Sequence, residues 1–206
     1  MPNKTDTTAK ARHTWTKPKK FDSNLVVIGA GSGGLVASYI AAAVKAKVTL
    51  IEQHKMGGDC LNTGCVPSKA LIRSTRLLAQ LSRSAEFGIK NIKAEFTFAD
   101  VMERVQRIVN TVASHDSIER YNQLGVDVIE GKARIISPWE VEAATPTGTR
   151  TISTLAIVIA TGAHPFVPPI PGIGQIDYLT SDTVWNLREQ PKRMVVLGGG
   201  CFDFPG

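Results

Sequence analysis

Cysteine and histidine are scarce in this sequence. The 206 residues include three cysteines, Cys60, Cys65 and Cys201, and four histidines that are scattered along the chain. A zinc site needs closely spaced cysteines or histidines as ligands, and a secreted disulfide framework needs a larger, even set of cysteines. We therefore expect no metal site and no fold that is held together by several disulfides.

Net positive charge is almost absent from the chain outside its first twenty residues. Residues 1–20 contain six lysines and arginines against one acid, so they carry +5 of the net charge of +6. A nucleic-acid-binding domain is expected to show its basic surface on the folded part. Here the charge lies in a stretch rich in Thr, Lys and Pro, which is typical of disorder. We predict a disordered basic leader over residues 1–22 and no nucleic-acid partner.

Signals for secretion and for membrane insertion are also missing. The leader has no apolar core of the kind that a secretory signal peptide requires. Residues 25–44 carry no charge and are long enough to span a bilayer. However, the glycine cluster within them favours a strand, a turn and a helix over a single spanning helix. We therefore expect a cytoplasmic protein with no membrane partner.

A strand–turn–helix–strand pattern follows the leader. An apolar run at residues 24–28 leads into the glycine turn, residues 29–34, and helical spacing then continues to Val44. A second apolar run, residues 48–52, ends in Glu52. With 43% hydrophobic residues, the chain can bury one core and form one or two domains. The pattern predicts a βαβ unit that binds a dinucleotide.

Each glycine of such a unit, and the acid at its end, has a physical role. Gly29 allows the tight turn, Gly31 lets the backbone approach the pyrophosphate, and Gly34 lets the helix pack closely. The helix N-terminus faces the phosphates. Glu52 lies at the spacing expected for a carboxylate that binds a ribose hydroxyl. The glycine pattern alone does not distinguish FAD from NAD.

Two of the cysteines lie close together in the stretch GGDCLNTGCVPSK, residues 57–69. A disulfide between Cys60 and Cys65 would close a small loop, and a strained or exposed disulfide is labile, which suits catalysis. Helical spacing after Cys65 places this thiol at a helix N-terminus, and Lys69 adds positive charge one turn later; both favour a thiolate. Spacing alone leaves open that the cysteines are small buried hydrophobes.

The stretch 57–69 resembles the active-site signature of the class I pyridine nucleotide-disulfide oxidoreductases. Asp59 and Thr63 differ from the commonest residues of that signature, at positions on which the chemistry does not depend. A second stretch, Ala-Thr-Gly-Ala-His-Pro at residues 160–165, resembles the segment that closes the FAD domain in the same family. The two matches lie far apart in the chain and indicate the same family.

The resemblance implies roles for individual residues. Cys60 would exchange with the substrate, Cys65 would face the flavin, and Lys69 would lie beside the reactive edge of the flavin. Ala133 would contact the adenine of FAD through its backbone. The full set of residues expected to bind FAD is Gly29, Gly31, Ser32, Gly33, Gly34, Glu52, Gly58, Asp59, Cys60, Lys69, Ala133, Thr161, Gly162 and Ala163.

The remaining pattern indicates the α/β fold class. Residues 98–124 have helical spacing and predict one long helix or a helix pair, and residues 126–129 predict a strand. A small antiparallel meander is predicted from three short segments, residues 131–135, 140–142 and 151–152. A buried strand at residues 155–159 follows. We expect a Rossmann-like FAD-binding domain with a parallel sheet, helices and this β-meander.

The resemblance weakens near the C-terminus. Residues 181–187 predict a short helix capped by Ser181 or Asp182. Residues 193–200 predict the strand and glycine turn that begin the NAD(P)H domain in the family. Asp203 and Pro205 then stand where the family has a glycine and a glutamate, and a proline disfavours the helix expected to follow.

These patterns divide the chain into three parts. We expect the leader at residues 1–22, an incomplete FAD-binding domain at residues 23–168, and a linker with the truncated start of an NAD(P)H-binding domain at residues 169–206. Intact members of the family are more than twice as long and form homodimers. The sequence is therefore expected to be a fragment, a truncated product or a frameshifted one.

The resemblance implies an FAD-dependent NAD(P)H:disulfide oxidoreductase with a redox-active Cys60–Cys65 disulfide. Its substrate would be a small-molecule disulfide or dithiol, or a metal ion. One alternative is a truncated, non-catalytic FAD-binding module. Another is a simple NAD-binding dehydrogenase, which would leave the cysteine pair and the second matched stretch unexplained.

Overall fold

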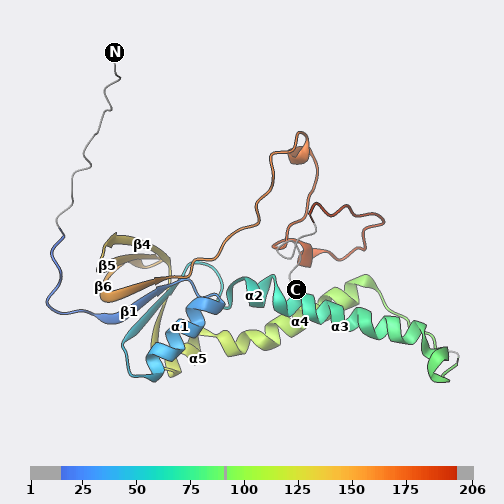
Figure 1. The fold of residues 1–206 in the computed structure, drawn as a ribbon, viewed down its shortest axis with the longest axis horizontal. Helices are drawn as coiled ribbons and strands as arrows, with labels where there is room; N and C mark the ends of the chain where they lie inside the picture. The colour runs from blue at the N-terminus through green and yellow to red at the C-terminus, as the bar shows by residue number, and fades with distance from the viewer. Residues whose placement is uncertain (1–14, 91, 199–206) are drawn as a thin grey trace, which may run out of the picture.

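Six strands form one sheet in the computed structural model, which describes residues 15–90 and 92–198. In chain order the strands are β1 (Ser23–Ile28), β2 (Val48–Glu52), β3 (Val126–Glu130), β4 (Lys132–Ser137), β5 (Glu140–Thr145) and β6 (Gly148–Ile159). Across the sheet the order is β3-β2-β1-β6-β5-β4. The first three strands are parallel to one another, and β4, β5 and β6 form an antiparallel meander (Figure 1). The predicted fold class is confirmed.

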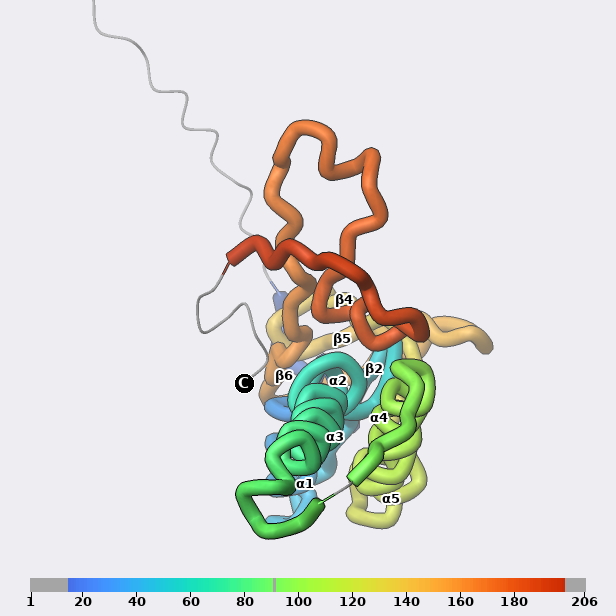
Figure 2. The backbone as a smooth tube through the Cα atoms, turned by 90° about the vertical axis from the view of Figure 1, so that its right-hand side faces the viewer, coloured from blue at the N-terminus to red at the C-terminus, as the bar shows by residue number. Residues whose placement is uncertain are grey.

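Five α-helices and four short 3-10 turns complete the described chain. They are α1 (Ser32–Ala43), α2 (Gly58–Asn62), α3 (Cys65–Ser82), η1 (Ser84–Phe87), α4 (Phe98–Ala113), η2 (Ser114–Asp116), α5 (Ile118–Gln123), η3 (Ile173–Gln175) and η4 (Val184–Asn186). Helices α1 and α5 pack on the parallel strands, whereas α3 and α4 pack on each other and extend away from the sheet (Figures 1 and 2). None of the described helices combines the length and apolar character needed to cross a bilayer.

The core lies on both faces of the parallel strands. Successive side chains of a strand point to opposite faces, so Val27 and Leu50 pack in the cluster with α1, whereas Val26 and Ile51 pack in the cluster with the meander. All four of these side chains have no more than 1% of their surface exposed. Burial on two faces explains why β1 and β2 are mostly apolar and show no alternation of apolar and polar residues.

Strand β6 is longer than the sequence predicts. Residues 151–152 and 155–159 were expected to form separate strands, but they belong to one strand that changes neighbours. Its first half pairs antiparallel with β5, and its second half pairs parallel with β1. The polar residue Thr154 between the two segments suggests a break, yet it is fully buried, and its hydroxyl donates to the carbonyl of Ala156 at 2.9 Å.

The predicted helical region 98–124 is a helix pair. Helix α4 begins with a capping box, in which the hydroxyl of Thr97 accepts from the amide of Asp100 at 3.1 Å. The break before α5 is fixed by Ser117, whose hydroxyl accepts from the amide of Arg120 at 3.2 Å. Serine and threonine at these positions satisfy amides that the helix itself cannot.

Two expectations for the C-terminal part are wrong. Residues 181–187 form no α-helix, and only the 3-10 turn η4 is present there, with Thr183 at its N-cap. Residues 193–197 form no strand; Val195 is 85% exposed, and a strand requires a partner for its backbone. Residues 1–14 of the predicted leader, and Cys201, Asp203 and Pro205, lie outside the described residues, so the expected domain limits remain predictions.

Candidate functional site

A cavity of about 750 Å³ lies at the carboxyl ends of β1, β2 and β6. Its lining comes from the glycine turn, the end of β2, α2, β4 and the segment after β6, and it includes Gly29, Gly31, Ser32, Gly33, Glu52, Gly58, Asp59, Cys60, Ala133, Thr161, Gly162 and Ala163. All the residues expected to bind FAD are in this lining except Gly34 and Lys69. Parallel sheets bind ligands at this edge, so the fold gathers residues that are distant in sequence.

The glycine turn and α2 approach each other at one wall of the cavity. Gly58 has φ +54°, and a Cβ atom built on it would lie 2.6 Å from Cα of Gly31. Two backbones can come this close only where side chains are absent. The wall is therefore bare backbone, which suits a ligand whose phosphates must contact amide groups.

Glu52 is fixed in place by two backbone amides. Its Oε2 accepts from the amide of Ala30 at 2.6 Å, and its Oε1 accepts from the amide of His54 at 2.7 Å. The half-buried carboxylate thus joins the glycine turn to the end of β2. A carboxylate has about four lone-pair positions, so Glu52 keeps acceptor capacity for the hydroxyls of a ligand. The sequence predicts the ligand contact of Glu52 but not its backbone contacts.

The redox loop, residues 57–65, carries both cysteines of the motif as free thiols. Cys60 lies in α2 and is half-buried, whereas Cys65 is exposed and is the first residue of α3. This position of Cys65 at a helix N-terminus is confirmed. Asn62 holds the loop, because its side-chain amide donates to the carbonyls of Met56 and Gly58 at 3.0 and 2.8 Å.

The pKa of Cys60 lies above its ordinary value. The largest cause is a hydrogen bond to the side chain of Cys65, and partial burial raises the pKa further. A hydrogen bond from Ser32 acts in the opposite direction and links the glycine turn to the redox loop. Cys60 therefore keeps its proton to a higher pH than an isolated cysteine does, and its reactivity as a thiolate rises with pH.

The cavity wall contains only one of the three residues expected to be catalytic. Cys60 is part of the lining, whereas Cys65 and Lys69 are not. The resemblance instead implies that Cys65 faces the flavin, and the separate roles of the two cysteines remain predictions. Lys69 lies on α3 one turn after Cys65, with an exposed side chain.

Trp185 contacts the redox loop and was not identified from the sequence. Its Nε1 donates to the carbonyl of Thr63 at 2.7 Å, across 122 positions of sequence. His164, in the loop that follows β6, lies 3.7 Å from Asp182 at the cavity. A local sequence pattern cannot predict these contacts, because they depend on the path of the chain after β6.

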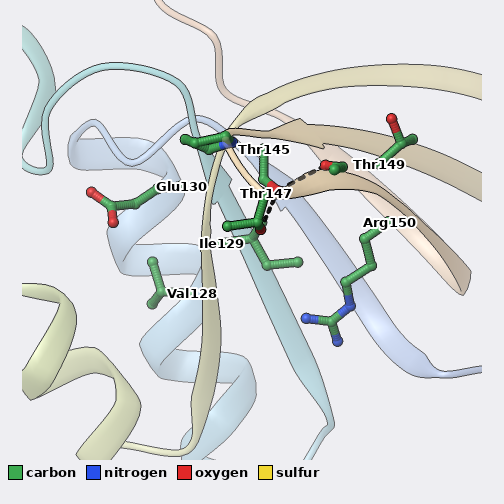
Figure 3. Close-up of a pocket in the computed structure, with 9 residues that line it drawn as sticks. Val128, Ile129, Glu130, Thr145, Thr147, Thr149 and Arg150 are labelled. Atoms are coloured by element: carbon green, nitrogen blue, oxygen red, sulfur yellow. Dashed lines mark hydrogen bonds between the residues drawn. The ribbon is translucent and has the colours of Figure 1, made fainter.

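A second cavity, of about 540 Å³, lies between the end of β3 and the β5–β6 turn. The hydroxyls of Thr145 and Thr147 contact each other at 3.1 Å (Figure 3). Arg150 pairs with Asp127 at 2.9 Å. Two lining hydroxyls thus bind each other, Arg150 is paired with a residue outside the lining, and the lining contains no cysteine. Across the described part of the chain, no cluster of three His, Cys, Asp or Glu side chains could hold a metal ion.

Comparison with known proteins agrees with this geometry. A family model described as pyridine nucleotide-disulphide oxidoreductase matches residues 23–202. Mercuric reductase from Staphylococcus aureus is 32% identical over 179 residues, which cover 87% of this chain and 32% of that protein. Dihydrolipoyl dehydrogenase from Chlamydia muridarum is 36% identical over 178 residues, which cover 85% of this chain and 38% of that protein.

Solved structures give the same result. The Cu(II) complex of the HOCl-induced flavoprotein disulfide reductase from Escherichia coli superposes with a TM-score of 0.65 and 28% sequence identity, covering 81% of this chain and 35% of that chain. The present chain thus spans about a third of the length of the relatives it matches. With the family model matched over most of the chain, and with the glycine turn and a cysteine of the motif at one cavity, the chain belongs to the pyridine nucleotide-disulphide oxidoreductase family.

Proposed function

We propose that the cavity at the strand ends binds FAD and that Cys60 and Cys65 form the redox-active pair of an NAD(P)H:disulfide oxidoreductase. One observation carries this proposal: the glycine turn, Glu52 and Cys60 line the same cavity. A cysteine at the wall of a dinucleotide site has no role in a simple NAD-binding dehydrogenase. The family description names a pyridine nucleotide and a disulfide, and the similar Escherichia coli structure is described as a flavoprotein disulfide reductase, which supports the choice of cofactors.

The residues of the cavity fit the parts of FAD. The N-terminus of α1 would direct its amides, and the hydroxyl of Ser32, toward the pyrophosphate. Glu52 would accept from the hydroxyls of the ribose, and the backbone at Ala133 would meet the adenine. The contact between Gly31 and Gly58 leaves bare backbone at this wall, as a closely bound pyrophosphate requires. Residues 161–163 would close the opposite side.

The cysteine pair would carry two electrons to the substrate. Bound FAD would supply the chemistry that accepts a hydride from NAD(P)H and passes electrons on. The thiolate of Cys60 attacks one sulfur of the substrate disulfide and forms a mixed disulfide, while the other substrate sulfur leaves and takes up a proton. Cys65 then attacks the sulfur of Cys60, which forms the Cys60–Cys65 disulfide and releases the second substrate thiol. Because the pKa of Cys60 is raised, we expect the first step to accelerate as the pH rises.

The substrate belongs to one of two chemical classes. Glutathione reductase from Nostoc sp. and the dihydrolipoyl dehydrogenase above favour a small disulfide or dithiol, whereas the mercuric reductase favours a metal ion. A homodimer and a cytoplasmic location remain predictions. A second candidate function is a non-catalytic FAD-binding module, which is favoured by the position of Cys65 and Lys69 outside the lining of the cavity.

Reduction of bound FAD by a dithiol tests the proposal. The full chain would be loaded with FAD, freed of excess cofactor and treated with dithiothreitol without oxygen. We expect the visible flavin absorption to fall much faster than that of free FAD, because electrons reach the cofactor through the cysteine pair. The variants Cys60→Ser and Cys65→Ser should lose this acceleration, and Cys201→Ser, which leaves the motif intact, should keep it.

The outcomes separate the two candidate functions. Equal rates in the wild type and in both motif variants would contradict the redox role of the pair. A wild-type chain that retains FAD but reacts no faster than free FAD would support the non-catalytic module.

A further inference from the structure

A residue of the segment that follows β6 contacts the redox loop. Trp185 lies in η4, within the segment that follows β6, and η4 is adjacent to α2 (Figure 1). Its half-buried indole donates from Nε1 to the carbonyl of Thr63 at 2.7 Å. Thr63 is one of the four residues between Cys60 and Cys65, so this contact acts on the backbone that connects the two thiols.

The carbonyl of Thr63 has no partner within helix α3. Within the redox loop, the amide of Thr63 donates to the carbonyl of Asp59 at 2.9 Å, which ends α2. The carbonyl of Gly64 is taken by the amide of Ser68 at 3.0 Å, which begins α3. The corresponding partner for Thr63 would be residue 67, which is a proline and has no amide hydrogen. Helix α3 therefore cannot satisfy this carbonyl, and Trp185 does so instead.

Hydrogen bonds within the turn that contains Trp185 position its indole. The hydroxyl of Thr183 accepts from the amide of Thr180 at 2.9 Å, and the carbonyl of Thr183 accepts from the amide of Asn186 at 3.0 Å. These bonds fix the backbone on both sides of Trp185 before it reaches the loop. The contact is thus made by two preorganised turns, which reduces the entropy lost when it forms.

We infer that Trp185 is a positioning residue for the Cys60–Cys65 pair and that its hydrogen bond stabilises the dithiol form. The inference rests on the proposed redox function. The bond is present while both cysteines are free thiols. Thr63 lies among the four residues that a Cys60–Cys65 disulfide would close into a small ring, and we take this added constraint to weaken the contact of Trp185 with its carbonyl. Loss of the bond should therefore shift the pair toward the disulfide.

The substitution Trp185→Phe removes the N–H group and keeps an aromatic ring. The thiol–disulfide equilibrium of the pair would be measured in the full chain, carrying Cys201→Ser, against oxidised and reduced dithiothreitol, with alkylation and mass spectrometry. A hydrogen bond contributes about 0.5–1.5 kcal/mol, so we expect a shift toward the disulfide of about 3- to 10-fold. Trp139→Phe is the matched control, since this residue lies in the β4–β5 turn, and it should leave the equilibrium unchanged.

A spectroscopic measurement covers the case in which Trp185→Phe fails to fold. In a protein that carries both Trp15→Phe and Trp139→Phe, oxidation of the pair should change the emission of Trp185, because its indole contacts the carbonyl of Thr63 between the two cysteines. Absence of any change would overturn the inference. Equal thiol–disulfide equilibria in Trp185→Phe and Trp139→Phe would overturn this inference but would leave the proposed function intact. A wild-type pair that forms no disulfide would overturn both the inference and the proposed function.

Discussion

Replacing Glu52 with alanine is expected to weaken FAD binding by about 10- to 100-fold, because hydrogen bonds to a charged group contribute roughly 1.5–3 kcal/mol. The substitution removes the acceptor for the ribose hydroxyls. It also leaves the amides of Ala30 and His54 without the carboxylate that now fixes them at 2.6 and 2.7 Å. The glycine turn would lose its link to β2, so the phosphate-binding backbone would be less well ordered. Titration of the full chain with FAD, followed by flavin fluorescence, measures the effect.

Glu130 provides a matched control for this substitution. It is in register with Glu52 on the neighbouring strand β3 and ends that strand at the same edge of the sheet. Its side chain is exposed and lines the second cavity, not the first. Glu130→Ala should bind FAD as the wild type does. Wild-type affinity in Glu52→Ala, or an equal loss in both variants, would contradict the ribose role of Glu52.

Replacing Gly34 with alanine should destabilise the fold by about 3 kcal/mol, at the upper end of the usual range for overpacking. A Cβ atom at this position would overlap the carbonyl oxygen of Gly29 and would lie 3.3 Å from Cγ1 of Val27. Helix α1 cannot move away without opening the core around Val27, which has no exposed surface. Urea denaturation followed by circular dichroism measures the free energy of unfolding.

The adjacent residue Gly33 gives the opposite expectation. It also lies in the first turn of α1, but a Cβ atom there would have no heavy atom within 4 Å. Alanine reduces the backbone entropy of the unfolded chain, so Gly33→Ala should stabilise the fold by roughly 0.5–1 kcal/mol. If the two variants unfold at the same urea concentration, the close packing of α1 on the glycine turn is not what Gly34 provides.

The first half of the fold could be predicted because its signals are local. The apolar runs of β1 and β2, the glycine turn and the helical spacing each depend on a few neighbouring residues. The sequence also predicts that Glu52, Cys60 and Thr161 lie at one cavity, because parallel strands end at one edge of a sheet. Even Cys65 at the start of α3 follows from the spacing of the apolar residues after it.

The features that could not be predicted depend on distant parts of the chain. The contact of Trp185 with Thr63 spans 122 positions and is set by the path of the segment after β6. Strand β6 is long because it pairs with two different neighbouring strands. The local sequence does not show this pairing, so the polar residue Thr154 at its centre suggests that the strand ends there. The apolar run at residues 194–197 has strand composition, but composition supplies no partner for its backbone.

The visible absorption spectrum of the purified full chain, recorded after addition of FAD and removal of the unbound cofactor, tests the central claim most directly. The described cavity contains the glycine turn, Glu52 and a cysteine of the motif at one wall. We therefore predict that a flavin spectrum remains with the protein, at close to one FAD per chain, and that it is largely lost in Glu52→Ala. A folded wild-type chain that stays colourless after the same treatment would contradict the assignment of this cavity to FAD.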